Sequence, residues 1–296
     1  MHWGLAMSRW IVAIASVFVI AGLPAQAAEP FQPTRFTAEV EGSGPDVILI
    51  PGLATSRAEF ADLARRLGGR YRLHLIQVAG FAGTAAGANA QGPVIAPLAE
   101  EVHRYIASRA LRRPAIIGHS MGGLVGLLIA ERHPEDLGRL MIVDSLPFYP
   151  AIISPSITVA QVEPVAARLR DGVIAATPAQ FAASEVQTAQ RLSKTPAGQA
   201  LVADWGSRSD QGVAARATYD DMTTDARPGL AAIQAPVMVL YAWDAAMGPQ
   251  ATVDGLYAGQ YASLPHKTLA RVDGSFHFIP LDQPGAFVAA VSSFLK

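Results

Sequence analysis

Short apolar runs alternate with longer stretches of helical periodicity along residues 35–144, and the same alternation returns after residue 236. The runs have the length of buried strands, and the stretches between them repeat apolar residues at spacings near 3.6. Strands alternating with helices indicate a mostly parallel sheet covered by helices on both faces. The predicted strands are residues 35–40, 47–50, 71–78, 114–117, 140–143, 236–241 and 267–272, and the predicted helices are residues 56–67, 98–111, 121–132 and 284–295.

Two local signals refine the first part of this pattern. Residues 41–45, Glu-Gly-Ser-Gly-Pro, have turn chemistry and predict a hairpin between the first two strands. Ser56 followed by Glu59 predicts a capping box that opens the helix of residues 56–67.

The alternation stops over residues 145–227, where we predict helices at 177–192 and 197–205 and no strand. We therefore expect residues 28–144 and 228–296 to form an α/β core, with residues 145–227 as a helical cap over the carboxyl ends of the strands. A separate helical domain is disfavoured, because the segment is short and interrupted by prolines.

The N-terminal residues have the pattern of a secretory signal. A positively charged start at residues 1–9 precedes an apolar run at 10–23 and the sequence Ala25-Gln26-Ala27. This order predicts cleavage after Ala27 and a secreted or periplasmic protein. The apolar run is shorter than the ~20 residues that span a bilayer, so we expect no stable membrane insertion after cleavage.

Composition narrows the possible chemistry. The chain has no cysteine, which excludes disulfides, thiolate metal sites, a cysteine nucleophile and a lipoprotein anchor. Hydrophobic residues make up 51% and charged residues 16%, with a formal net charge of −1. This balance is typical of a well-buried globular protein and offers no basic surface for nucleic acid. We expect a small-molecule partner and neither a cofactor nor a metal.

Residues 118–122, Gly-His-Ser-Met-Gly, match the pattern G-x-S-x-G between a predicted strand and a predicted helix. This context is that of a nucleophile elbow, in which Ser120 projects from a sharp turn. A serine hydroxyl is a weak nucleophile without an adjacent base, and helix N–H groups can stabilise the negative charge that develops. Gly118 and Gly122 allow the strained turn. Three small residues then let the helix lie close to the sheet: Gly123, Gly126 and Ala130.

With this elbow on a parallel sheet, the chain resembles the α/β-hydrolase superfamily, in particular its capped serine esterases, over nearly all of residues 42–296. Four further segments match the pattern of that family: Leu-Ile-Pro-Gly-Leu at 49–53, Gly-Phe-Ala-Gly at 80–83, Ser-Phe-His-Phe at 275–278 and Leu-Asp-Gln-Pro at 281–284. The resemblance implies an α/β-hydrolase fold with a helical cap insertion.

The resemblance implies that Ser120 is the nucleophile and His277 the general base. His277 lies in a loop between the last predicted strand and the last helix, which is where the family keeps this histidine. The remaining histidines lie in the N-terminal segment, in or beside predicted strands and helices, or next to the serine, and are not expected to act as the base: His2, His74, His103, His119, His133 and His266.

For the triad acid we favour Asp244, which follows the predicted strand 236–241, the family's usual place for it. The fit is imperfect, because Ala242 replaces the glycine that usually precedes the acid and Asp244 comes one residue early. Asp144, directly after the strand 140–143, is the alternative. Asp273 and Asp282 are expected to be surface or loop-stabilising carboxylates.

The resemblance also places the oxyanion hole. Its donors are the backbone N–H of Met121, directly after the nucleophile, and that of Leu53, after Pro51-Gly52.

These assignments predict hydrolysis of a carboxylic ester of a small to medium apolar substrate through an acyl-enzyme on Ser120. A related thioester, lactone or C–C bond is a near alternative, whereas hydrolases of the fold that use an aspartate nucleophile are excluded by Ser120. Six residues of the cap are candidates either to line the pocket or to form the core of the cap: Phe148, Tyr149, Phe181, Trp205, Tyr219 and Met222.

Two other functions remain open. A catalytically inactive ligand-binding protein is disfavoured because the chain has Ser120, His277 and two candidate acids. A capped aminopeptidase needs carboxylates in the cap to hold the substrate amine. Asp220, Asp221 and Asp225 form such a group, but they precede a Pro228-Gly229 turn and are expected to cap a helix.

The N-terminal pattern generates a direct prediction. After expression in a secreting bacterium, mass spectrometry of the protein from the periplasm or medium should show Ala28 as the first residue. An intact Met1 on that fraction would contradict the assignment of a cleaved signal.

Overall fold

The computed structural model describes residues 1–3 and 31–296. Residues Phe31–Lys296 form one compact unit, and the fold described below is that of this unit. Of the predicted signal at residues 1–27, residues 4–27 lie outside the described residues. Within the described part, no helix is long and apolar enough to cross a bilayer.

A seven-stranded sheet forms the centre of the fold, with the strand order β1-β3-β2-β4-β5-β6-β7. All neighbouring strands are parallel except β1, which is antiparallel to β3. The predicted mostly parallel sheet is therefore confirmed. The strands are β1 (Phe36–Gly42), β2 (Asp46–Ile50), β3 (Arg72–Val78), β4 (Ala115–His119), β5 (Arg139–Val143), β6 (Val237–Trp243) and β7 (Lys267–Asp273).

The predicted hairpin between the first two strands is wrong, because β3 lies between β1 and β2. Gly42 and Gly44 instead carry the chain past the start of β3 with positive φ angles of 80° and 117°. A Cβ atom on Gly42 would lie 2.3 Å from the carbonyl oxygens of Gly68 and Tyr71. These glycines thus serve a close backbone crossing, a use that local turn chemistry does not distinguish from a hairpin.

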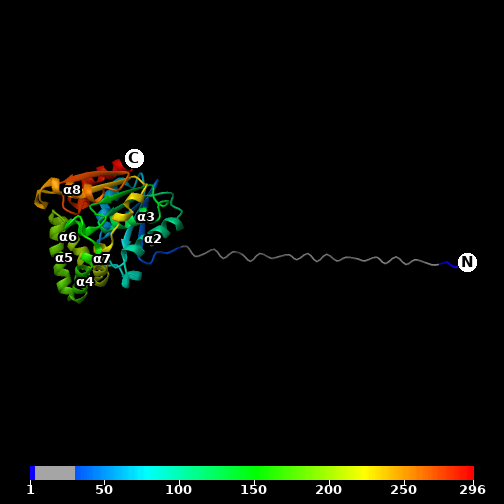
Figure 1. The fold of residues 1–296 in the computed structure, drawn as a ribbon, viewed down its shortest axis with the longest axis horizontal. Coiled ribbons are helices and arrows are strands. Elements are labelled where there is room, and N and C mark those ends of the chain that lie inside the picture. Colours follow the sequence, from blue (N-terminus) through cyan, green and yellow to red (C-terminus); the bar gives the residue numbers. More distant parts are fainter. Residues whose placement is uncertain (4–30) are drawn as a thin grey trace. The chain divides into compact units, whose positions relative to one another are not determined.

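Helices cover both faces of the sheet (Figure 1). The strand side chains alternate between two cores, as the pleat requires. On β2, Val47 and Leu49 contribute to the core beneath α1 and α10, whereas Ile48 and Ile50 contribute to the core beneath α2 and α3. The helices outside the insertion are α1 (Ala61–Leu67), α2 (Ile95–Ser108), α3 (Met121–Arg132), α8 (Gln250–Gln260), α9 (Ile279–Asp282) and α10 (Pro284–Phe294), of which α8 and α9 were not predicted.

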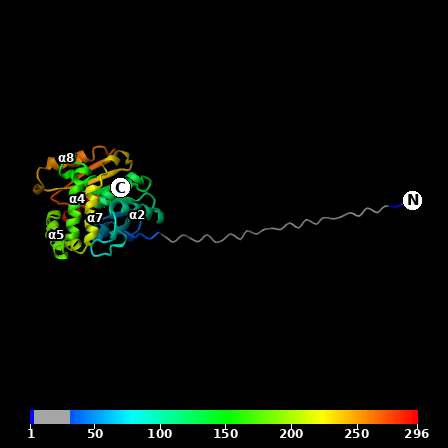
Figure 2. The same ribbon diagram turned by 60° about the horizontal axis from the view of Figure 1, so that its bottom comes forward.

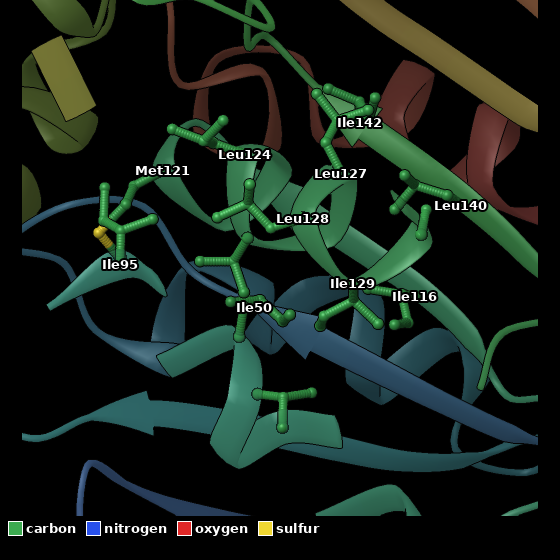
Figure 3. Packing of buried hydrophobic residues seen from close by; sticks show 14 of the residues in the cluster. Ile50, Ile95, Ile116, Met121, Leu124, Leu127, Leu128, Ile129, Leu140 and Ile142 are labelled. Atoms are coloured by element: carbon green, nitrogen blue, oxygen red, sulfur yellow. The ribbon is translucent and has the colours of Figure 1, made fainter. Parts of the chain in front are cut away.

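The α3 helix lies against the sheet at short range, and Figure 3 shows its apolar side chains among those of β2, β4 and β5. A Cβ atom on Gly126 would lie 2.6 Å from Cδ1 of Leu140, and one on Gly123 would lie 2.9 Å from Cβ of Ser145. The expectation that small residues let this helix approach the sheet is confirmed. Larger residues at these positions would push α3, and Ser120 at its start, away from the strand ends.

Four helices lie between β5 and β6: α4 (Val159–Ala175), α5 (Pro178–Leu192), α6 (Pro196–Ser207) and α7 (Gln211–Thr223). They pack as two pairs, α4 with α7 and α5 with α6. Figure 2 shows α4 and α7 side by side. We refer to residues 145–227 as the helical insertion. The α5 helix begins with a capping box at Thr177, which satisfies its first backbone N–H groups.

The start of α1 differs from the prediction. Ser56 accepts a hydrogen bond from the backbone N–H of Ala58 at 3.2 Å, and the chain first forms a 3₁₀ turn, η1 (Arg57–Phe60). The Glu59 side chain does not reach back to Ser56. It is buried and contacts His119 instead, so the predicted capping box is wrong.

Candidate active site

The predicted elbow is a strained turn between β4 and α3. Ser120 has φ 53° and ψ −122°, a conformation that side-chain-bearing residues rarely adopt. A Cβ atom on Gly118 would lie 2.1 Å from the carbonyl oxygen of Gly122, and one on Gly122 would lie 2.2 Å from that of Ile50. Both positions therefore require glycine because backbone atoms occupy the space of a side chain. Ser120 is thereby held at the N-terminus of α3.

Ser120 lines a cavity of about 610 Å³ between the carboxyl ends of the strands and the helical insertion. Asp144 and His277 line the same cavity. The apolar part of its wall comes from both the core and the insertion, and consists of Leu53, Leu146, Ile152, Leu192, Ala246, Met247 and Phe276. The polar residues contributed by the insertion are Ser145, Tyr149, Gln190, Arg191, Thr218 and Asp221.

His277 is held by Asp144. The ring Nδ1 lies 2.7 Å from Oδ2 of the carboxylate. Because a carboxylate accepts hydrogen bonds, Nδ1 carries the hydrogen in this contact, and Nε2 of the neutral ring is left as the basic nitrogen. Oδ1 of Asp144 accepts from the backbone N–H of Ala242 at 2.8 Å and from the Tyr257 hydroxyl at 2.9 Å. The carboxylate is thus fixed from three sides.

The contact with His277 that we favoured for Asp244 is made by Asp144 instead. Asp244 accepts a hydrogen bond from Nζ of Lys194 at 2.5 Å and one from the backbone N–H of Ala246 at 2.9 Å. The hydrogen bond from Lys194 holds the pKa of Asp244 below its ordinary value. Asp244 therefore joins the β6–α8 loop to the helical insertion and does not contact His277.

The sheet register explains this difference. β5 is the neighbour of β4, and the backbone N–H of Ser120 donates to the carbonyl of Val143 at 2.9 Å. Asp144, the residue after Val143, therefore lies beside the nucleophile. β6 lies one strand farther from β4, and Asp244 follows the end of that strand.

Tyr257 on α8 completes the surroundings of Asp144. Burial, and then the nearby carboxylate, raise the pKa of Tyr257 well above its ordinary value, so its hydroxyl stays protonated and donates. The sequence offered no pattern for this residue, because α8 was not predicted and the contact joins positions far apart in the chain.

Asp282 fixes the loop that carries His277, as expected for a loop-stabilising carboxylate. It accepts from the backbone N–H of Phe276 at 3.0 Å, from the Ser193 hydroxyl at 2.7 Å and from the backbone N–H of Lys194 at 2.9 Å. One buried carboxylate therefore ties the histidine loop to the α5–α6 connection. Asp273 pairs with Arg271 near the surface.

The two predicted oxyanion donors lie beside Ser120. Met121 is the first residue of α3, where a helix leaves its N–H groups without an acceptor in the helix. Leu53 lines the cavity. A Cβ atom on the preceding Gly52 would lie 3.4 Å from Cβ of Ser120, so the loop after β2 packs directly against the elbow.

Beneath the elbow lies a buried pair that the sequence analysis missed. Nδ1 of His119 lies 3.2 Å from Oε2 of Glu59, and both side chains are fully buried. Nε2 of His119 lies 3.1 Å from the backbone carbonyl of His277. Burial would lower the pKa of His119, but the Glu59 carboxylate outweighs it and raises the pKa above its ordinary value. His119 thus connects the elbow to the backbone of the histidine loop.

Of the six aromatic and methionine candidates in the helical insertion, Tyr149 lines the cavity. The other five belong to buried clusters: Phe148, Met222 and Tyr219 in one, Trp205 in a second and Phe181 in a third.

One group among the described residues has spacing suited to a metal: His103, His133 and Glu135. None of the three lines the cavity of Ser120. The His103 ring contacts Asp136 at 2.6 Å and the His133 ring contacts Glu100 at 2.9 Å, so both imidazoles also serve to join α2 to the end of α3.

The elbow glycines generate a stability prediction. Gly122→Ala should lower the free energy of unfolding by several kcal/mol, because its Cβ would overlap the Ile50 carbonyl, a contact that backbone cannot relieve cheaply. The control is Gly172→Ala in α4, where no atom lies within 4 Å and helix propensity predicts a gain of up to about 1 kcal/mol. Equal effects in chemical denaturation would contradict the described elbow.

The His119–Glu59 pair generates a pH prediction. A raised folded-state pKa gives His119 a stabilising contribution that is full below its unfolded pKa and is lost as the pH rises through the folded value. In Glu59→Gln, burial remains without the carboxylate, so this contribution should reverse sign and stability should fall as the pH falls. Denaturation of both proteins between about pH 5 and 9 measures the difference, in which the other titrating groups cancel. Identical slopes would show that His119 is not charged by Glu59.

Comparison with known proteins places this geometry in a family. A profile described as "Alpha/beta hydrolase family" matches residues 47–291. A pimeloyl-[acyl-carrier protein] methyl ester esterase of Aeromonas hydrophila subsp. hydrophila is 33% identical over 110 residues, which are 37% of this chain and 41% of that protein. The match thus spans about two fifths of the length of the curated relative.

Solved structures extend the similarity of fold to most of the chain. A thermophilic esterase from Thermogutta terrifontis superimposes with a TM-score of 0.73 at 18% identity, covering 88% of this chain and 92% of its own. The enol-lactonase of Burkholderia xenovorans LB400 superimposes with a TM-score of 0.67 at 20% identity, covering 88% and 96%. With its profile match, its sheet order and its strained serine turn, the chain belongs to the α/β-hydrolase family.

Proposed function

We propose that this protein hydrolyses carboxylic esters through an acyl-enzyme formed on Ser120. The proposal rests on one observation. Ser120, at a strained helix N-terminus, lines the same cavity as His277, whose Nδ1 is hydrogen-bonded to the buried carboxylate of Asp144. An esterase among the curated relatives and another among the similar structures support the same reaction class.

The proposed reaction begins with attack of Ser120 Oγ on the ester carbonyl carbon while Nε2 of His277 takes the hydroxyl proton. The carbonyl oxygen becomes an oxyanion, which the N–H groups of Met121 and Leu53 stabilise. The C–O bond then breaks, and His277 returns its proton to the leaving alcohol. Water, deprotonated by His277, attacks the acyl-enzyme and releases the acid, and the proton returns to Ser120.

In this proposal Asp144 is the triad acid. Its hydrogen bond selects the tautomer with a basic Nε2 and stabilises the imidazolium formed during both steps. The donors Ala242 and Tyr257 keep the carboxylate in place. Asp244, paired with Lys194, acts as a link between the core and the insertion.

The substrate class follows from the cavity wall. Leucine, isoleucine, methionine and phenylalanine side chains supply apolar contact, and a volume of about 610 Å³ suits a small to medium ester. We propose that residues 145–227 act as a cap, because side chains from the insertion form one side of this cavity. Export through the N-terminal signal remains part of the proposal and would place this activity outside the cytoplasm.

Ser120→Ala should abolish turnover of p-nitrophenyl esters and labelling by a fluorophosphonate probe, with an unchanged circular dichroism spectrum. Loss of a triad member costs on the order of 10⁶ in kcat in a well-studied serine hydrolase. Labelling also tests the alternative of an inactive ligand-binding protein, since an unactivated serine would not react. Wild-type protein that neither labels nor turns over any ester would contradict the proposal.

Asp144→Asn should lower kcat by about 10⁴-fold, the loss seen when a triad carboxylate is replaced by its amide. Asp244→Asn should lose less than about tenfold, because Asp244 pairs with Lys194 and does not contact His277. Ester hydrolysis by the two variants, measured side by side, decides between them. The reverse order of losses would instead identify Asp244, after β6, as the triad acid.

A further inference from the structure

Three carboxylates near the end of α7 have different surroundings. Asp220 accepts hydrogen bonds from the backbone N–H groups of Val94 and Ile95, at the start of α2. Asp225 pairs with Arg227. Asp220 therefore caps α2, as predicted for this group, whereas Asp225 forms a local ion pair instead. Asp221 does neither.

Asp221 lines the cavity of Ser120 from the side of the helical insertion. Among the described residues, its side chain makes no hydrogen bond within 3.5 Å and no ion pair within 4.0 Å. The charged or titratable groups that share its surroundings are Asp220 on α7, Tyr149 on η3 (Tyr149–Ile152), Arg191 on α5, and Asp144, Tyr257 and His277, which line the same cavity. Arg191 is not within ion-pair distance, so no cation of the described chain neutralises Asp221.

This position is costly for an acid. Burial, and then the neighbouring Asp220 carboxylate, raise the pKa of Asp221 to about 7. An ionised carboxylate in such a place lowers stability unless a partner is supplied. If this position only packed the cavity wall, an apolar or amide side chain would lower the stability less than an aspartate does. A cation bound in the cavity would pair with Asp221 and offset the loss of stability. Active-site residues commonly lower the stability of the free enzyme because they serve its function.

We propose that Asp221 binds an ammonium group on the non-reacting part of the substrate, so that the preferred substrates are esters that carry an amine. This inference rests on the proposed esterase function. The apolar wall between the nucleophile and Asp221 would contact the carbon chain that separates the ester from the amine. Specificity then comes from a charge-assisted hydrogen bond made away from the reacting carbonyl.

The test compares matched p-nitrophenyl esters of straight-chain acids that end in either an ammonium or a methyl group, over several chain lengths. A second series places the amine on the alcohol, as matched acetates of amino alcohols and alkanols. The wild-type ratio of kcat/KM, amine over methyl, should reach about 10- to 100-fold at one chain length, the value of a hydrogen bond to a charged group.

Asp221→Asn should bring that ratio close to one. The matched control is Asp171→Asn, which removes the same charge from an exposed position of α4 and should leave the ratio unchanged. In wild-type protein the ratio should also fall as the pH drops below about 7 and Asp221 gains a proton. A change in catalytic rate that affects both esters alike cancels in the ratio.

A ratio near one in both series, or a preference that survives in Asp221→Asn, would overturn the assignment to Asp221. Preference for a hydroxyl-terminated ester over the amine would also overturn it, and would show a neutral donor site. In each of these cases the methyl-terminated esters are still hydrolysed and the esterase proposal stands. If the wild-type protein hydrolysed none of the esters, this result would instead contradict the proposed function itself.

Discussion

The close backbone approach at the start of α3 determines where the groups of the site can lie. Gly118 and Gly122 leave no room for a side chain against the backbone of the elbow and of β2. This contact brings together the end of β2, the end of β4 and the N-terminus of α3. This one turn positions Ser120 and the N–H of Met121, and the neighbouring strand β2 positions Leu53. The strain at Ser120 is maintained because packing on both sides of the sheet holds these elements in place.

Neighbouring strand ends supply the rest of the proposed triad. Asp144 follows the strand beside the nucleophile, and its carboxylate accepts hydrogen bonds from β6 and α8. His277 is brought to it by a loop that Asp282 ties to the helical insertion. A second, buried link runs from Glu59 through His119 to the carbonyl of His277. The histidine is therefore positioned from its ring and from its backbone by separate contacts.

The features that could be predicted from the sequence are those with a local signal. Ser120 has glycines at fixed offsets, His277 lies between a strand and a helix, and the alternation of strands and helices gives the parallel sheet. The position of β1, the partner of Glu59 and the contact of Asp144 could not be read in this way. Each depends on which strands are neighbours, and the sequence around Asp244 is as compatible with an acid as that around Asp144. Asp221 was visible only as one of three nearby carboxylates, since their separate environments arise from packing.

The measurement that tests this account most directly is the NMR signal of the proton between His277 and Asp144. A histidine Nδ1–H bonded to a buried carboxylate is strongly deshielded and exchanges slowly enough to be observed. We predict such a downfield resonance in the wild-type protein, its loss in Asp144→Asn and its persistence in Asp244→Asn. A resonance that survives in Asp144→Asn and disappears in Asp244→Asn would contradict the arrangement on which the proposed function depends.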